Sequence, residues 1–218
     1  MRQYTLNLKK DLSFLEEDFI ESSSNFIAVK WISSWPHWYG SIFSNITCIY
    51  GPAGSGKTHL AYIWKTKSLA HLVTLKDMEH FLYHKDISSY IIDDIEQFLV
   101  NEKVLLLFLN YIIENKKYLL ITVKCKLRDL PIIIPDLRSR LQSFMAYEIT
   151  SPDDKLIEQM LVKSFSDQQI IVSEEVIKYL TSRIDRSYAA VKFTVDLLNK
   201  TSLSEHKKVT ISLIKATL

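Results

Sequence analysis

A glycine-rich stretch near residue 50 constrains this 218-residue chain more than any other feature. The chain has only four glycines, and three of them lie within residues 51–58, which read G-P-A-G-S-G-K-T. The five residues before this stretch, 46–50, predict a strand, and the pattern after it predicts an amphipathic helix. A strand, a glycine loop and a helix N-terminus in this order present a nest of N–H groups to phosphate. The sequence therefore predicts a phosphate-binding loop that holds a nucleoside diphosphate or triphosphate.

The loop and the first turn of the following helix supply the candidate nucleotide contacts, which are Gly51, Pro52, Gly54, Ser55, Gly56, Lys57, Thr58 and His59. We expect the Lys57 ammonium to reach the β- and γ-phosphates and the Thr58 hydroxyl to be a ligand of Mg²⁺. An ordinary glycine-rich turn is the alternative, but such a turn does not require the strand before it and the helix after it.

A second candidate element is an apolar run, residues 90–92, that ends in two carboxylates. We expect Asp93 to end a strand next to the phosphate-loop strand and to hold Mg²⁺ directly or through water. Asp94 would then orient or activate the attacking water, with Glu96 as a weaker candidate for this base. A turn or a helix cap is the alternative interpretation of the Asp-Asp pair.

A third element, residues 135–141, reads P-D-L-R-S-R-L and predicts a short helix. Arg138 and Arg140 are two residues apart, so they point in different directions, and one can pair internally while the other projects outward. An outward guanidinium can neutralise charge on the γ-phosphate of a neighbouring molecule. From the spacing alone, surface ion pairing explains the two arginines equally well.

Strand and helix patterns alternate over the first part of the chain, which predicts an α/β fold with a parallel sheet and flanking helices. The expected strands are 46–50, 71–75, 89–94, 118–123 and 144–149, and the expected helices are 18–38, 58–69, 78–83, 104–114 and 136–142.

From residue 151 onwards the pattern is entirely helical, with helices expected at 154–166, 173–183, 187–200 and 210–217. This predicts three parts, namely a polar tail at 1–10, a nucleotide-binding domain at 11–150 and a small helical lid domain at 151–218.

Composition excludes several classes of protein. The net charge is +2, so no strong field for a polyanion is predicted, and we expect no direct sequence-specific DNA binding. No apolar run is long enough to span a membrane, and no signal peptide pattern opens the chain. Cys48 and Cys125 lack metal-site spacing and fit a reducing, cytoplasmic location.

The order and spacing of 51–60, 92–96 and 135–141 resemble the AAA+ ATPases of the DnaA clade. The resemblance implies an AAA+ sheet with a helical lid, and ADP or ATP with Mg²⁺ as the ligands. It also implies that Phe19 and Ile20 pack on the adenine and that Arg140 acts as an arginine finger on a neighbouring subunit.

Within this clade the chain is similar to Hda-like regulatory proteins, because it stops at Leu218, where the lid should end and a DNA-reading domain would otherwise follow. Residues 3–8, Q-Y-T-L-N-L, resemble the hexapeptide by which these regulators dock on the DNA polymerase sliding clamp. Gln3 would be the polar anchor, and Leu6 and Leu8 would fill an apolar pocket. The implied partners are the clamp and a DnaA-type initiator, and a homodimer is left open.

Two positions depart from the clade. Ala189 stands where the lid usually carries an arginine for the γ-phosphate, with Arg186 one turn away as a candidate substitute, and Lys124 stands near the polar sensor after the fourth strand. The resemblance thus implies a regulator with slow or absent hydrolysis of its own, with ADP as a candidate working ligand, that stimulates ATP hydrolysis by the initiator and limits re-initiation. The alternatives are an AAA+ helicase loader or related loading factor, and a P-loop small-molecule kinase.

Overall fold

The computed structural model describes residues 14–38, 43–79 and 86–218. The expected tail at 1–10, with Gln3, Leu6 and Leu8, lies outside the described residues, as does most of the expected helix at 78–83.

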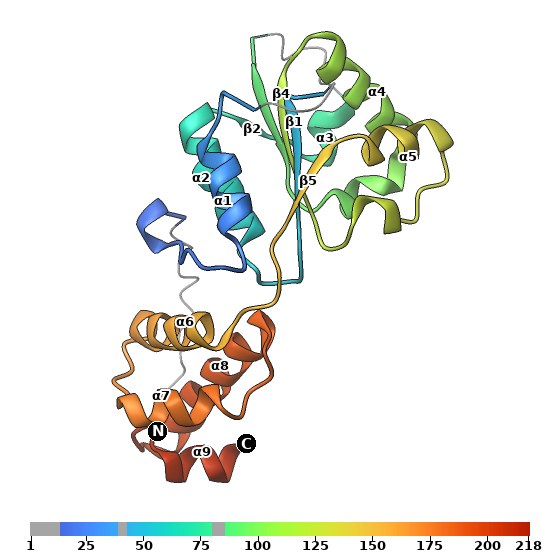
Figure 1. Ribbon diagram of the computed structural model, residues 1–218. Helices are drawn as coiled ribbons and strands as arrows, with labels where there is room; N and C mark the ends of the chain where they lie inside the picture. The colour runs from blue at the N-terminus through green and yellow to red at the C-terminus, as the bar shows by residue number, and fades with distance from the viewer. Residues whose placement is uncertain (1–13, 39–42, 80–85) are drawn as a thin grey trace.

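Five parallel strands form one sheet in the order β2-β3-β4-β1-β5 (Figure 1). Their bounds are β1 Ile46–Tyr50, β2 His71–Leu72, β3 Ser89–Ile92, β4 Tyr118–Val123 and β5 Met145–Glu148. The central strands are buried along nearly their whole length, as expected for parallel strands that are covered on both faces. The predicted α/β fold is therefore confirmed.

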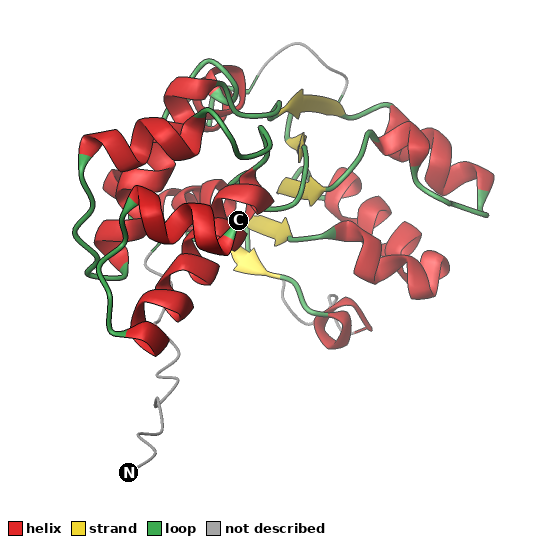
Figure 2. Ribbon diagram, turned by 90° about the horizontal axis from the view of Figure 1, so that it is seen from below, coloured by secondary structure: helices red, strands yellow, loops and turns green. Residues whose placement is uncertain are grey.

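Helices cover both faces of this sheet, as Figure 2 shows. One face packs against α1 Phe26–Ser33 and α2 Lys57–Ser68. The other packs against α3 Leu75–Glu79, α4 Glu102–Glu114 and α5 Pro135–Gln142. Short 3₁₀ helices among the described residues of this part are η1 Glu16–Asp18, η3 Ile95–Asn101 and η4 Leu127–Asp129.

Four helices follow the sheet and gather beyond the carboxyl end of its strands (Figure 1), namely α6 Asp154–Asp167, α7 Glu174–Thr181, α8 Tyr188–Glu205 and α9 Ile211–Thr217. They share a core that includes Leu161, Phe165 and Leu180. Side chains of Asp153, Ser187 and Thr210 accept backbone N–H bonds at the starts of α6, α8 and α9, which explains where these helices begin. The boundaries of the three predicted parts stay a prediction.

The order of the strands corrects one expectation. We expected the strand that ends in Asp93 to lie next to the phosphate-loop strand, but β4 lies between β3 and β1. The prediction was wrong because sequence order does not say which strand a crossover places in the middle of a sheet.

Two elements are shorter than the sequence pattern predicts, and one was not predicted. The second strand ends at Leu72, because Thr74 and Asp77 exchange hydrogen bonds as a capping box and start α3 at Leu75. Within the helical pattern at 18–38, α1 covers only Phe26–Ser33; it begins after the serine cluster at 22–24, where the Asn25 side chain bonds the backbone of the preceding turn. The 3₁₀ helix at Ile95–Asn101 was not predicted.

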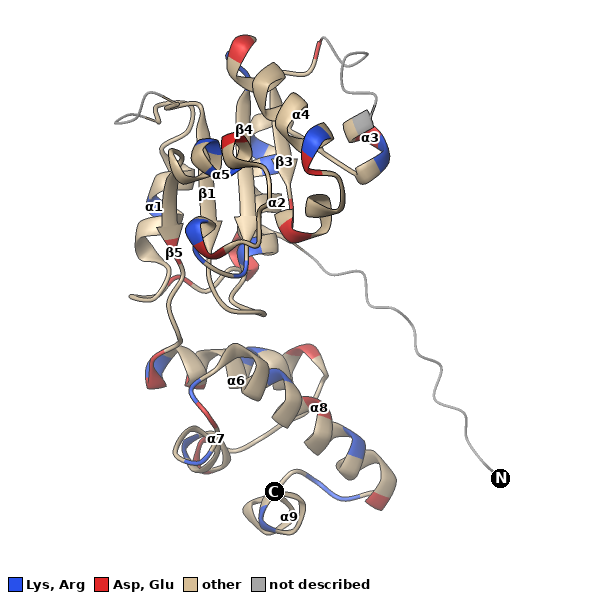
Figure 3. Ribbon diagram, turned by 90° about the vertical axis from the view of Figure 1, so that its right-hand side faces the viewer, with Lys and Arg blue, Asp and Glu red and all other residues tan. Residues whose placement is uncertain are grey.

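The charged residues are dispersed over the sheet, its helices and the four C-terminal helices (Figure 3), in agreement with the small net charge. Among the described residues, no helix is both long enough and apolar enough to cross a membrane.

Candidate nucleotide-binding site

The loop at 51–56 joins the carboxyl end of β1 to the N-terminus of α2, where two positions require glycine. A Cβ on Gly51 would lie 2.4 Å from the Ile149 carbonyl oxygen. Gly56 has φ +88°, and a Cβ there would lie 3.0 Å from the Phe19 ring. Glycine at these two positions therefore lets the loop pack closely against Ile149 and Phe19 at the N-terminus of α2. This is the arrangement that the phosphate-binding motif predicts.

Lys57 is the charged residue of this loop, and only 9% of its surface is exposed. Its Nζ donates to the carbonyl oxygens of Gly51 at 2.7 Å and Pro52 at 2.8 Å. Burial lowers the pKa of Lys57, while the carboxylates of Glu96, Asp94 and Asp93 act in the opposite direction. Both carbonyl acceptors are neutral, so an anionic phosphate would be a stronger acceptor for the same ammonium.

Thr58 and Asp93 are in direct contact although the strands that precede them, β1 and β3, are not neighbours. The Thr58 hydroxyl lies 3.0 Å and 3.1 Å from the two carboxylate oxygens of Asp93, and Thr122 Oγ1 donates to Oδ1 of Asp93 at 2.6 Å. Thr122 belongs to β4, so the strand that separates β3 from β1 also supports this contact. A hydroxyl and a carboxylate side by side suit Mg²⁺, which completes its shell with water and phosphate oxygens. Within the described part of the chain, no cluster of three or more His, Cys, Asp or Glu residues offers an alternative metal site.

Asp94 is held in a left-handed conformation, with φ +61°. Its backbone N–H donates to Thr122 Oγ1 at 2.8 Å, and its Oδ2 accepts from Lys124 Nζ at 2.8 Å. Burial opposes ionisation, but hydrogen bonds from Glu96 and Lys124 prevail and lower the pKa of Asp94. Burial and the hydrogen bond to Asp94 raise the pKa of Glu96. Of these two carboxyl groups, Glu96 therefore takes up a proton first and Asp94 remains ionised.

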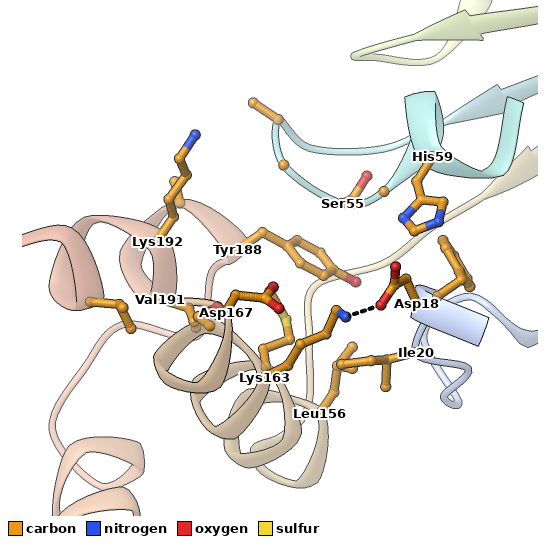
Figure 4. A pocket seen from close by; sticks show the side chains of 18 of the residues that line it. Asp18, Ile20, Ser55, His59, Leu156, Lys163, Asp167, Tyr188, Val191 and Lys192 are labelled. Carbon is orange, nitrogen blue, oxygen red and sulfur yellow. Dashed lines mark hydrogen bonds and ion pairs between the residues drawn. The ribbon is translucent and has the colours of Figure 1, made fainter. Parts of the chain in front are cut away.

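A cavity of about 690 Å³ opens between the loop, the N-terminal segment and the four-helix part (Figure 4). The structure places the predicted Gly54, Ser55, Gly56, His59, Phe19 and Ile20 in its wall. His59 has a further role, because its ring nitrogen lies 2.8 Å from the Leu15 carbonyl oxygen and its ring packs edge-on against Phe19. It thereby holds the N-terminal segment against α2.

Two links across this cavity were not predicted from the sequence. The Lys163 ammonium of α6 pairs with the Asp18 carboxylate (Figure 4). The buried Tyr188 hydroxyl of α8 donates to the Thr150 carbonyl oxygen and bonds Ser24 Oγ, both at 3.1 Å. Asp18 directly precedes Phe19, and Tyr188 directly precedes Ala189, but nothing in the sequence pairs either residue with its partner.

The lid residues differ in whether they line the cavity. Ala189 lines the cavity, as does Lys192 one turn later. Arg186, the candidate substitute for a lid arginine, does not line it, and its guanidinium pairs with Asp154 at 2.8 Å and 3.1 Å on the surface. Lys192 is thus a lid cation at the cavity that the sequence analysis missed, and its helical spacing from Ala189 could have revealed it.

The two arginines of α5 lie on the sheet face opposite α1 and α2, and neither lines the cavity. Arg140 is half-buried and donates to Asn110 Oδ1 of α4, whereas the exposed Arg138 donates to the Ile132 carbonyl oxygen. The Glu102 carboxylate fixes the start of α5, because it accepts from the backbone of the residues just before the helix. Neither arginine is in an ion pair with a described residue.

The fold and the site together identify the class of protein. A phosphate loop after β1, a carboxylate after β3, the strand order β2-β3-β4-β1-β5 and a helical lid are those of an AAA+ protein. Residues 153–218 match the family described as "Hda, lid domain". This match and the AAA+ features together confirm the resemblance to the Hda-like proteins of the DnaA clade.

Sequence relatives include the chromosomal replication initiator protein DnaA of Buchnera aphidicola subsp. Cinara cedri, which is 24% identical over 230 residues. That match covers 92% of this chain and 51% of the relative, so the chain spans about half the length of the DnaA proteins it matches. An uncharacterized protein of Haemophilus influenzae is 27% identical over 184 residues, covering 78% of this chain and 80% of the relative.

Solved structures agree in fold. Domain III of the Thermotoga maritima DnaA superposes with a TM-score of 0.74 at 18% identity and covers 94% of this chain and 95% of that one. The AMPPCP-bound DnaA of Aquifex aeolicus gives a TM-score of 0.66 at 19% identity over 86% of this chain and 65% of that one. At these identities the likeness establishes the fold alone.

Proposed function

We propose that this chain is a nucleotide-bound AAA+ regulator of replication initiation, which docks on the DNA sliding clamp and stimulates ATP hydrolysis by a DnaA-type initiator. The observation that carries the proposal is the joining of an Hda-type lid, at residues 153–218, to a sheet with a complete phosphate loop. The whole process would limit re-initiation, because it converts the initiator to its ADP form.

The proposed ligand of this chain is ADP or ATP with Mg²⁺. The Lys57 ammonium and the N–H groups of the loop would hold the phosphates, and Thr58 with Asp93 would hold the ion. Phe19 and Ile20, in the wall of the cavity, would pack on the adenine. The structurally similar DnaA of Aquifex aeolicus is AMPPCP-bound, which supports the choice of an adenine nucleotide.

The proposed action on the partner depends on Arg140. A guanidinium that is supplied by a neighbour stabilises the charge that spreads over the γ-phosphoryl group during its transfer to water. Two observations support this role, since Arg140 is absent from the wall of its own cavity and its acceptor, Asn110, is neutral. Giving up a neutral acceptor costs less than breaking an ion pair, so Arg140 can turn outward when a partner's phosphate offers a better one.

The proposed clamp contact depends on residues 3–8, and the motif is its whole support. Gln3 would bind as the polar anchor, with Leu6 and Leu8 in an apolar pocket. The proposed partners act on DNA in the cytoplasm, which is where we propose that the chain works.

Turnover of initiator-bound ATP, in the presence of clamp and DNA, tests this function. We expect wild-type protein to accelerate turnover, and Arg140→Ala to lose nearly all of a stimulation that reaches ~10³-fold or more in comparable systems. Arg140→Lys should rescue poorly, because a point charge does not reproduce the planar fork.

Arg138→Ala is the matched control, since Arg138 lies on the same helix and also donates to a neutral acceptor. It should retain most of the stimulation. Full stimulation by Arg140→Ala would refute the trans mechanism. A Gln3→Ala/Leu6→Ala double variant that still binds the clamp would separately refute the proposed docking.

A further inference from the structure

Lys124 makes a contact that is unexpected beside the predicted catalytic carboxylate. It follows β4 directly, and its ammonium lies 2.8 Å from Oδ2 of Asp94. The backbone N–H of the same lysine donates to Oε1 of Glu96 at 2.8 Å. One residue therefore binds both carboxyl groups that could act as the base.

The other oxygen of each carboxyl group is inaccessible. Oδ1 of Asp94 and Oε2 of Glu96 are both buried from solvent. For Asp94, one carboxylate oxygen is thus enclosed by protein and the other is bound by an ammonium, while the backbone N–H is fixed by Thr122. The side chain is 28% exposed, but its one oxygen that is open to solvent, Oδ2, is already bound by the Lys124 ammonium and accepts from Gln97 Nε2 at 3.4 Å.

The contact with Lys124 hinders Asp94 from acting as a general base in ATP hydrolysis. In ATP hydrolysis a water oxygen forms a bond to the γ-phosphorus, the bond from the γ-phosphorus to the β–γ bridging oxygen breaks, ADP leaves, and one proton of the water must be accepted. A carboxylate accepts that proton only if an oxygen is within hydrogen-bond reach of the water. Lys124 opposes this requirement, because its ammonium occupies Oδ2 of Asp94.

We propose that Lys124 is a built-in block on hydrolysis, a positioning residue that holds Asp94 away from water so that the chain keeps its bound nucleotide intact. The inference depends on the proposed nucleotide binding, and it adds a cause for slow hydrolysis that is separate from the absent lid arginine. It makes the chain suited to act on a partner's nucleotide rather than its own.

Lys124 is a good site for substitution, because 55% of its side chain is exposed and its loss should leave the fold intact. The experiment measures hydrolysis of bound ATP by excess full-length protein in a single turnover, alongside ADP and ATP affinity by titration calorimetry. Lys124→Ala and Lys124→Gln remove the charge, and Lys124→Arg retains it. Lys126→Ala, two residues along the chain and also exposed, is the control for a lost surface charge.

We expect the Ala and Gln variants to hydrolyse ATP about tenfold faster or more, a part of the ~10²–10⁴-fold that a positioned base supplies. Affinities should change little, and the Arg and Lys126→Ala variants should behave as wild type. Adding Asp94→Asn to Lys124→Ala should abolish the gain, which a merely structural effect would not predict.

Unchanged or slower hydrolysis in the Ala and Gln variants, with nucleotide still bound, would overturn the block and leave the proposed function standing. A wild-type protein that binds neither ADP nor ATP would overturn both, and the calorimetry distinguishes these two failures.

Discussion

Two regions near the loop at 51–56 differ in how well they match their expected chemistry. In the proposed phosphate-holding region, the Lys57 ammonium lies at the loop and the Thr58 hydroxyl contacts Asp93, which is the placement that we expect for binding. In the region where hydrolysis would occur, Lys124 neutralises Asp94, and Ala189 stands where the resemblance implies an arginine.

The difference shows that binding and hydrolysis depend on separable sets of side chains. Phosphate binding uses backbone N–H groups, one ammonium and one ion, and none of these needs an accessible base. Hydrolysis adds groups that act only in the transition state, and in this chain we propose that Lys124 blocks one of them, while Ala189 replaces another. A protein with the first set alone is a nucleotide-dependent scaffold, which fits a regulator that acts on a partner's ATP.

The largest expected effect is in the phosphate-holding region. Lys57→Ala should weaken ADP and ATP binding by about a hundredfold or more, because one full charge and its charge-assisted hydrogen bonds to phosphate are lost. Calorimetric titration of both nucleotides measures this. Lys65→Ala, on the same helix but in its last turn and away from the loop, should bind as wild type does. Equal affinity in Lys57→Ala and Lys65→Ala would remove the distinction between the two regions.

The phosphate-holding region was largely predictable from the sequence, because its residues are consecutive. Residues 51–58 specify a loop and a helix N-terminus through local backbone geometry, so their placement needs no knowledge of the rest of the fold. Asp93 was also identified, although its expected position next to β1 was wrong. It still meets Thr58 because the carboxyl ends of all five parallel strands lie at the same edge of the sheet.

The second region was less predictable, because it forms through contacts between distant segments. Lys124 could be identified as unusual, but its pairing with Asp94 depends on β3 and β4 being neighbours. The sequence also left Arg186 as a substitute for the lid arginine, whereas its position beside Asp154 follows from the packing of α6 and α8. Lys163 and Asp18 lie 145 residues apart, and no local pattern joins them.

A medium effect is expected when an arginine is supplied at the lid position that Ala189 occupies. Wild-type protein should bind ATP and ADP within about tenfold of each other, a difference of ~1.4 kcal/mol. Ala189→Arg should shift the preference towards ATP by about tenfold, since a guanidinium at the cavity wall can contact the additional phosphate. The ratio of the two dissociation constants is the measurement.

Arg186→Ala is the control for that shift and should leave the ratio unchanged, because Arg186 is paired outside the cavity. A hundredfold ATP preference in wild type would contradict the comparison of the two regions. The Lys192→Ala variant would then show whether that residue senses the γ-phosphate.

The smallest effect should come from the link between the N-terminal segment and the lid. Lys163→Ala removes the ion pair with Asp18, in which about a third of each side chain is exposed. Exposed pairs contribute about 0.2–1 kcal/mol, so we expect ADP affinity to fall by no more than about fivefold and the free energy of unfolding to change by less than about 1 kcal/mol. Calorimetry and urea unfolding measure the two quantities, with Lys155→Ala on the exposed surface of the same helix as the control. If Lys163→Ala lost as much ADP affinity as Lys57→Ala, the lid would determine nucleotide binding together with the phosphate loop. The phosphate-holding region would then have to include α6.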